Sequence, residues 1–225
     1  MRAVIAASFW LLACGCAVAG ALPCSGDPRI TVEAERPAIM AAACDAVARA
    51  RPRLAACHLD QSRPLVIRVV DETQHLDEAC LAYYDCRDDS ISVSGPDALS
   101  RSLKHDSIWA RIAPAALFDS LITHELAHAF LDQTECTGVP CYADHEYIAY
   151  ALQIDGLSPE DRARVLDGHK VRLPVDPMGL NEFTVLSAPG YFAQAAWLHF
   201  SAPDNGCAFV EKLIEGTDTL RIPSE

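Results

Sequence analysis

The spacing of hydrophobic and polar positions predicts strands and one helix in the first part of the chain. Short apolar runs at 29–33 and 65–70 indicate strands, and the second run is typical of a buried strand. An alternating pattern at 91–94, ended by Gly-Pro, predicts a half-exposed strand whose edge could pair with an extended peptide. Between the first two runs, an alanine-rich stretch at 37–49 predicts a helix that begins with a proline.

Longer apolar stretches predict that the second part is mainly helical. The run at 114–133 carries few charges, so it is typical of a helix that is buried on most of its surface. A second helix is expected at 144–152, and a capped helix start is expected at Ser158, which precedes a proline. Two further helices are expected at about 191–200 and 207–215.

This order of elements predicts an α+β fold, with a small mixed sheet followed by a mainly helical C-terminal part. A chain of 225 residues without a low-complexity linker suits a single domain. We expect that domain over 22–225, with an upper part that holds the sheet at about 22–135 and a lower helical part at about 136–225.

The helix predicted at 114–133 contains the sequence His124-Glu125-Leu126-Ala127-His128. Residues four apart lie on one face of a helix, so both imidazoles can reach one metal ion. Glu125 is rotated by about 100° from His124, which places it outside the ligand set but within reach of an attacking water as a general base. Burying two histidines and a glutamate in an apolar helix would be costly without a metal ion. The motif therefore predicts a catalytic Zn²⁺ site.

Catalytic zinc usually has three protein ligands and one open position, so a third ligand is required. Glu146, in the helix predicted at 144–152, is the expected ligand. His145 is the alternative, because imidazole is an equally good donor, and the sequence leaves this choice open.

With these residues the chain resembles the zincin metallopeptidases, and among them the gluzincin type. In that type the third ligand is a glutamate on a following helix, often in an ExxA context, which Glu146 to Ala149 fits. No third histidine follows His128 at short spacing, which disfavours the metzincin pattern. The resemblance covers mainly residues 114–152. It implies a zincin-like fold and a small secreted bacterial family whose members hydrolyse peptide bonds with zinc-activated water and Glu125 as general base.

A hydrolase of this type also needs a donor for the oxyanion that forms in the transition state. Tyr191 and His199 are our candidates, because they lie eight apart in the helix predicted at 191–200 and so share a face. Core packing is the alternative role for Tyr191, and Tyr142 and Tyr147 are further available side chains.

Zinc-bound imidazoles normally donate their second ring N–H to a carboxylate or a carbonyl. Asp119, Asp132 and Asp144 lie near the motif in sequence and could accept these hydrogen bonds. The alternative for each is an ordinary solvated acid on an acidic protein.

The first 21 residues predict a secretory signal peptide, with Arg2, an apolar run and small residues toward Ala19 and Ala21. Cleavage after either alanine would start the mature chain near Leu22. Because Leu11 to Cys14 resembles a lipobox, a lipid anchor on Cys14 is the alternative. No second apolar span follows, so we expect no transmembrane segment and a secreted or periplasmic protein.

The chain has 10 cysteines, and an even number remains after the predicted signal peptide. In an oxidising compartment this number favours disulfides, and the absence of a CxxC pair disfavours a cysteine metal site. The closely spaced pairs are our candidates: Cys80 with Cys86, and Cys136 with Cys141.

The formal net charge of −13 disfavours nucleic acids and anionic membranes as partners and favours neutral or basic peptides. Two other functions remain open: a noncatalytic zincin-like binding module, and a disulfide-rich secreted interaction protein with an accidental motif. The intact Glu125 favours catalysis, because a purely structural site does not need a base. The sequence does not indicate an oligomeric state.

Overall fold

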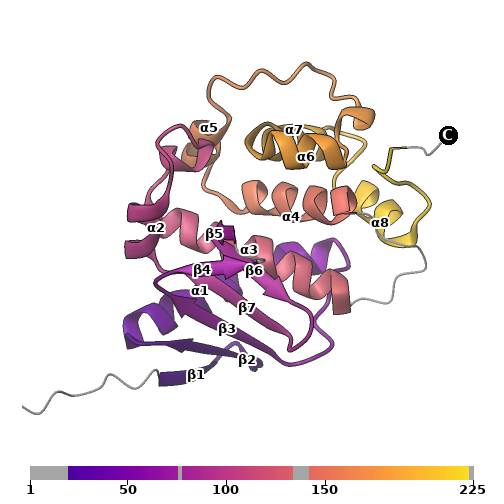
Figure 1. Cartoon of the computed structure of the whole chain (residues 1–225). Coiled ribbons are helices and arrows are strands. Elements are labelled where there is room, and N and C mark those ends of the chain that lie inside the picture. The colour runs from indigo at the N-terminus through magenta and orange to yellow at the C-terminus, as the bar shows by residue number, and fades with distance from the viewer. Residues whose placement is uncertain (1–19, 76–77, 134–141, 223–225) are drawn as a thin grey trace, which may run out of the picture.

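The computed structural model describes residues 20–75, 78–133 and 142–222, and places a mixed five-stranded sheet on one side of the helices (Figure 1). The sheet order is β1-β2-β3-β7-β6, with β2, β3 and β7 parallel and the two outer strands antiparallel to their neighbours. A separate antiparallel pair joins β4 to β5. The strands are β1 (Gly20–Cys24), β2 (Asp27–Ala34), β3 (Leu65–Val70), β4 (Thr73–His75), β5 (Glu78–Cys80), β6 (Ala82–Asp85) and β7 (Ser90–Ser94).

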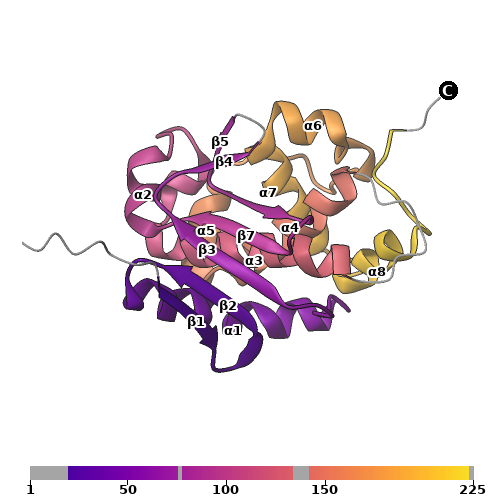
Figure 2. The ribbon, with the colours of Figure 1, turned by 60° about the horizontal axis from the view of Figure 1, so that its bottom comes forward.

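Alternate residues of the three parallel strands form one apolar face of the sheet. Ile30 lies beside Leu65, and Ile67 lies beside Ile91, and all four side chains are fully buried. Parallel neighbours need a long crossover, which α1 (Pro37–Ala56) provides between β2 and β3 while it packs against the sheet (Figure 2).

The helix α3 (Pro114–Gln133) is central in the molecule. It contacts α1 and the strands β6 and β7, and it also contacts α4 (Tyr142–Gly156), which is covered in turn by α7 (Pro189–Phe200). This position explains why α3 is apolar around most of its circumference. The other helical segments are α2 (Pro96–Ser102), η1 (Ile108–Arg111), α5 (Pro159–Leu166), η2 (Pro177–Gly179), α6 (Glu182–Ser187) and α8 (Cys207–Glu215).

The structure confirms the α+β class and most of the predicted elements. The predicted bounds of β3, α3 and α8 are those observed, and the side chain of Ser158 caps α5 by accepting a hydrogen bond from the backbone of Asp161. The helix α1 continues beyond the predicted 37–49 and contains Pro52, because Ala50 and Leu54 are buried in the core.

The prediction of a half-exposed edge strand at 91–94 is wrong. β7 lies between β3 and β6, and Ile91 and Val93 are fully buried. The edge is formed instead by β6, whose sequence Ala82-Tyr83-Tyr84-Asp85 lacks an alternating pattern. Pairing with a distant strand therefore determines which strand is internal.

In the described part of the chain, one disulfide joins two N-terminal elements and another joins the end of α1 to the C-terminal part. Cys24 in β1 bonds to Cys44 in α1, and Cys57 at the end of α1 bonds to Cys207 at the start of α8. They fit the expectation of a disulfide-bonded protein but not the predicted pairings.

The predicted disulfide between Cys80 and Cys86 is not formed. The extended strand β6 lies between these residues and adds about 3.3 Å per residue, whereas bridged Cα atoms lie about 4.4–6.8 Å apart. The predicted pair Cys136 and Cys141 lies outside the described residues.

The start of β1 bears on the predicted signal peptide, whose residues 1–19 lie outside the described part of the chain. Gly20 and Ala21 pair with Ala34 and Glu33. Cleavage after Ala19 would leave this pairing whole, whereas cleavage after Ala21 would remove two residues of the strand. Within the described ranges, no helix has the length and apolar character needed to cross a bilayer.

Candidate metal centre

Three ligand atoms meet where α3 faces α4. His124 and His128 come from α3, and Glu146 comes from the second turn of α4. The Nε2 atoms of the two histidines lie 3.1 Å apart. Oε2 of Glu146 lies 3.6 Å from Nε2 of His124, and Oε1 of Glu146 lies 3.5 Å from Nε2 of His128. With one ligand atom taken from each residue, the three atoms all lie within 4.8 Å of one another. The spacing on α3 and the packing of α4 against it thus bring the three side chains together.

These separations suit a tetrahedral metal ion. Donor atoms bound about 2.0–2.1 Å from a tetrahedral zinc ion lie about 3.3–3.4 Å from one another. The closest separations of 3.1, 3.5 and 3.6 Å lie on both sides of that value, the last two being to different oxygens of the Glu146 carboxylate. Three protein donors would leave the fourth position open, as in catalytic rather than structural zinc sites.

His145 lies near this group but does not belong to it. Among the described residues, the cluster that could hold a metal ion consists of His124, His128 and Glu146. The ring of His145 stacks at 6.4 Å from the ring of His128, measured between centroids. Because neighbouring residues on a helix point about 100° apart, Glu146 and His145 cannot both face the same point on α3. The geometry favours Glu146 as the third ligand.

Gln153 of α4 orients the first histidine. Its Oε1 lies 3.0 Å from Nδ1 of His124, and its Nε2 donates to Oγ of Ser120 at 3.1 Å. Ser120 donates in turn to the backbone carbonyl of Leu117. An amide oxygen only accepts, so Nδ1 carries the proton and Nε2 keeps its lone pair for a metal ion. The sequence had predicted acids for this role and not Gln153.

Burial shifts the pKa values of the four ionisable side chains at this site toward their neutral forms. Burial raises the pKa of Glu146 to about 7, although a hydrogen bond from Tyr142 favours its charged form. Burial and the nearby Glu146 raise the pKa of Glu125 well above its usual range. Burial also lowers the pKa of His124 to about 4, and that of His128 is lowered as well. One buried carboxyl between two neutral imidazoles is a donor set that suits a divalent cation, and the cation would also stabilise the charged form of the nearby Glu125.

The cluster opens into a cavity of about 600 Å³. One wall is the edge strand β6, which contributes Ala82, Tyr83 and Tyr84. On the side of α4, Tyr142 and Tyr150 line the same cavity as Glu125. Substrate-sized molecules can therefore approach the cluster between a strand and a helix.

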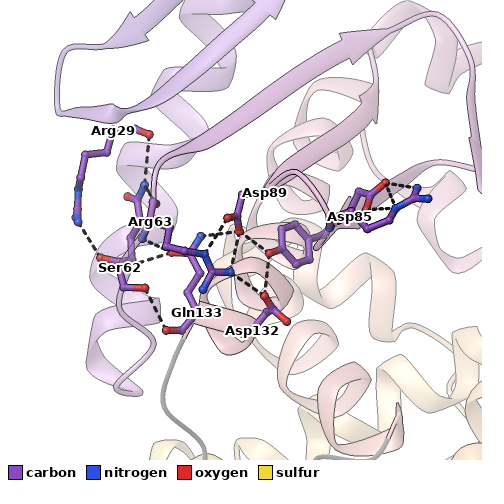
Figure 3. A network of polar contacts seen from close by, with 10 residues as sticks. Arg29, Ser62, Arg63, Asp85, Asp89, Asp132 and Gln133 are labelled. Atoms are coloured by element: carbon purple, nitrogen blue, oxygen red, sulfur yellow. Dashed lines mark hydrogen bonds and ion pairs between the residues drawn. The ribbon is translucent and has the colours of Figure 1, made fainter.

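A network of polar contacts fixes this strand to the end of α3 (Figure 3). The guanidinium group of Arg63 donates to Asp89 at 2.8 and 3.0 Å and to Asp132 at 2.9 Å. The hydroxyl of Tyr84 donates to the same two carboxylates, at 2.8 and 3.1 Å. Gln133 accepts from the backbone N–H of Arg63 at 2.9 Å and donates to Asp89 at 3.2 Å. Arg63 lowers the pKa of Asp89, which keeps that carboxyl charged.

Tyr84 connects the network to Glu125. Its side chain belongs to the network, while its backbone amide makes a hydrogen bond that lowers the pKa of Glu125. The position of β6 and the charge on the candidate base are therefore linked through one residue.

The three acids predicted as partners of the histidines have other partners. Asp132 belongs to the Arg63 network, and Asp119 accepts from Arg49 at 2.6 Å. Asp144, in the first turn of α4, accepts from the hydroxyl of Thr219 at 2.9 Å and from the backbone N–H of Leu220 at 2.7 Å. The end of the described chain thus holds the start of the helix that carries Glu146.

The structure places neither Tyr191 nor His199 among the described residues that line the metal cavity. Nδ1 of His199 lies 2.8 Å from the hydroxyl of Tyr147, in an aromatic core. The spacing of eight between Tyr191 and His199 puts both residues on one helix face but does not determine where that face packs.

Two other tyrosines line the cavity in their place. Tyr142 and Tyr150 each lie four residues from Glu146, so all three share a face of α4. The ring of Tyr150 packs edge-on against His124 at 4.6 Å between centroids. This i±4 relationship to Glu146 was the signal in the sequence that could have identified Tyr150.

Comparisons with curated proteins and with solved structures find no match for this chain. A protein-family model described as a family of unknown function, DUF6639, matches residues 30–223. The matched range includes α3, α4 and all the residues of the cluster. The chain therefore belongs to the DUF6639 family of unknown function.

Proposed function

We propose that this protein is a zinc-dependent metallopeptidase with a zincin-like fold that acts in an oxidising compartment outside the cytoplasm. His124, His128 and Glu146 would hold the ion, and Glu125 would act as general base. The observation that carries the proposal is the cluster of His124, His128 and Glu146, whose ligand atoms lie within 4.8 Å of one another, with Glu125 beside them in the same cavity. The two disulfides support the compartment.

A zinc ion bound there would act as a Lewis acid toward the scissile carbonyl and would make a nearby water more acidic. Glu125 would accept the proton of that water as it attacks and would deliver it to the departing amine. The backbone amide of Tyr84 holds the carboxylate of Glu125 from the side of β6.

Tyr142 and Tyr150 are the proposed donors to the oxyanion, in place of Tyr191 and His199. Burial raises the pKa of Tyr142 to about 12 and also raises that of Tyr150, so both hydroxyls keep their protons at neutral pH. A protonated phenol that faces the cavity can stabilise negative charge on the carbonyl oxygen as it develops.

A peptide substrate suits the shape of the cavity. Its wall is β6, which is the outermost strand of the sheet on this side, and edge strands are a common binding surface for extended peptides. The net charge of −13 favours neutral or basic peptides over anionic ones.

The proposal is tested by zinc content and peptide hydrolysis in protein exported to an oxidising compartment. Wild type should contain about one zinc ion per chain and cleave members of a peptide library. Glu125→Gln should keep the zinc and lose about 10²–10⁴-fold in kcat, whereas His128→Ala should lose both. Glu211→Gln, on the exposed side of α8, is the matched control and should behave as wild type.

Other outcomes would support the alternatives. Zinc without any hydrolysis, and without an effect of Glu125→Gln on peptide binding, would indicate a noncatalytic binding module. Folded wild-type protein that binds no zinc would indicate a disulfide-rich interaction protein.

A further inference from the structure

A second cavity, of about 460 Å³, adjoins the metal cavity. The two cavities share Tyr150, whose ring is part of both walls. That ring lies 4.6 Å from the ring of His124 and 6.4 Å from the ring of Trp109, and it is nearly parallel to Trp109 with an angle of 14° between the planes. A group in the second cavity would therefore be one aromatic ring away from a proposed metal ligand.

The walls of this cavity combine aromatic and aliphatic side chains with the polar side chains of Lys104, Asp106 and Ser107. Trp109, Tyr150 and Tyr191 contribute rings, and Ile108 and Pro189 contribute aliphatic surface. A volume of 460 Å³ lies within the range of about 300–1,000 Å³ that is typical of small-molecule sites. Walls of this kind bind aromatic groups by stacked and edge-on contacts in addition to burying apolar surface.

Tyr191 gives the strongest indication that a ligand occupies the cavity. It lies in the first turn of α7 and 40% of its surface is exposed, so its ring contributes little to the core. An exposed aromatic ring in the same cavity as a buried tryptophan is available to pack on an incoming side chain.

We propose that this second cavity, which we call the aromatic pocket, binds an aromatic side chain of the peptide substrate next to the bond that is cleaved. The inference rests on the proposed function for the nature of the substrate. Tyr191 is then a specificity-determining residue and not an oxyanion donor.

The pocket can be tested without a metal ion. N-acetyl-phenylalaninamide is titrated into chelator-treated protein, and its binding is followed by the emission of Trp109, with Trp109→Phe as the reference for the other tryptophans. Wild type should bind it at least about tenfold more tightly than N-acetyl-alaninamide, a difference typical of burying an aromatic group.

Variants of Tyr191 test whether the phenylalanine amide binds in the aromatic pocket. Tyr191→Ala should weaken binding of the phenylalanine amide about tenfold, while Tyr191→Phe, which keeps the ring, should bind as wild type. Phe183→Ala is the matched control, because this ring on α6 is 72% exposed and does not line the pocket. Equal binding of the two amides, or equal binding by Tyr191→Ala and wild type, would overturn the inference.

A second experiment separates this inference from the proposed function. Peptide pairs that carry Phe or Ala beside the scissile bond are compared with zinc-loaded protein, and Tyr191→Ala should lower kcat/KM about tenfold for the Phe peptides alone. Hydrolysis without any preference for Phe would overturn the aromatic pocket and leave the peptidase. Phenylalanine amide binding with no hydrolysis of any peptide would remove the peptidase and support the pocket as a binding site.

Discussion

Nδ1 of His124 and Oε1 of Gln153 lie 3.0 Å apart between two helices, and both side chains are buried. A neutral amide, rather than a carboxylate, therefore sets the tautomer of this histidine. The hydrogen bond from Gln153 to Ser120 fixes the direction of the amide, so its oxygen and not its nitrogen faces the ring.

Replacing Gln153 with Leu should weaken zinc binding by about 10–100-fold, because His124 would lose the acceptor that orients it. Competition with a chelator of known affinity measures this change. Gln194→Leu is the matched control, since this buried glutamine bonds to the carbonyl of Val165. Equal loss of zinc affinity in both variants would show that general destabilisation, and not the orientation of His124, is the cause.

Zinc affinity should depend on pH through Glu146. Its pKa of about 7 and that of His124 near 4 mean that at pH 6 the metal-free site holds a protonated carboxyl beside a neutral imidazole. A ligand must be deprotonated to bind, so affinity should rise about tenfold per pH unit up to about pH 7 and then level off. Calorimetry in two buffers of different ionisation enthalpy should detect release of about one proton at pH 6 and much less at pH 8.

Glu125→Gln is the appropriate background for that experiment, because it removes the other buried acid. Proton release that is the same at pH 6 and pH 8 in this variant would contradict the role assigned to Glu146.

The same groups predict how the stability of the metal-free protein changes with pH. The folded pKa of Glu146 lies above its ordinary value, so its contribution to stability is complete at low pH and is lost as pH rises through about 7. The folded pKa of His124 is depressed, so its contribution has the opposite sign and is complete above about pH 6.5. Between pH 6.5 and 8 the contribution of His124 no longer changes while that of Glu146 is still being lost, so the Tm of metal-free protein should fall.

Thermal unfolding followed by circular dichroism, with and without chelator, measures this change. The zinc-loaded protein should not show the same fall, since the ion keeps Glu146 charged in the folded state. The prediction would be wrong if Glu146→Gln had the same pH profile as metal-free wild type.

Tyr84→Phe should affect both stability and turnover. Loss of the hydroxyl removes its hydrogen bonds to Asp89 and Asp132, at a cost of about 1 kcal/mol in the free energy of unfolding. We expect kcat to fall severalfold at full zinc occupancy, because β6 also presents its amide to Glu125. A double-mutant cycle with Asp132→Asn should give a coupling energy of at least about 0.5 kcal/mol, and additive effects would contradict the network.

Removing the disulfide between Cys57 and Cys207 by serine substitution should destabilise the protein by about 2–5 kcal/mol. The bond joins residues 150 apart, whereas Cys24 and Cys44 are only 20 apart. On loop length alone, removing the shorter link should cost about 1–2 kcal/mol less. Urea unfolding of both double variants measures the difference, and a larger loss for the shorter link would contradict this order.

The elements predicted well from the sequence are those that depend on local information. The bounds of α3 follow from one long apolar run, and β3 follows from a short run between turn residues. The edge position of β6 could not be predicted, because it depends on pairing with β7 and on the absence of a further strand in the described sheet. The disulfide partners of Cys57 and Cys24 were missed for the same reason, since sequence separation does not give distance in space.

The residues of the candidate centre also differ in how far the sequence could predict their positions. His124, Glu125 and His128 are related by the period of a single helix, so their geometry follows from their spacing. The meeting of Glu146 with them depends on how α4 packs on α3, which the sequence could only suggest. Gln153 was not found because an amide in a buried helix resembles any other polar core residue until its partner is known.

The hydrogen bonds that Asp144 accepts from Thr219 and Leu220 affect when the candidate centre can form during synthesis. The first turn of α4, two residues before Glu146, is held by residues that follow Asp144 by 75 and 76 positions in the chain. A nascent or truncated polypeptide therefore carries the complete HExxH motif long before its third donor is fixed in place. Synthesis of the motif and completion of the candidate centre are therefore separate events.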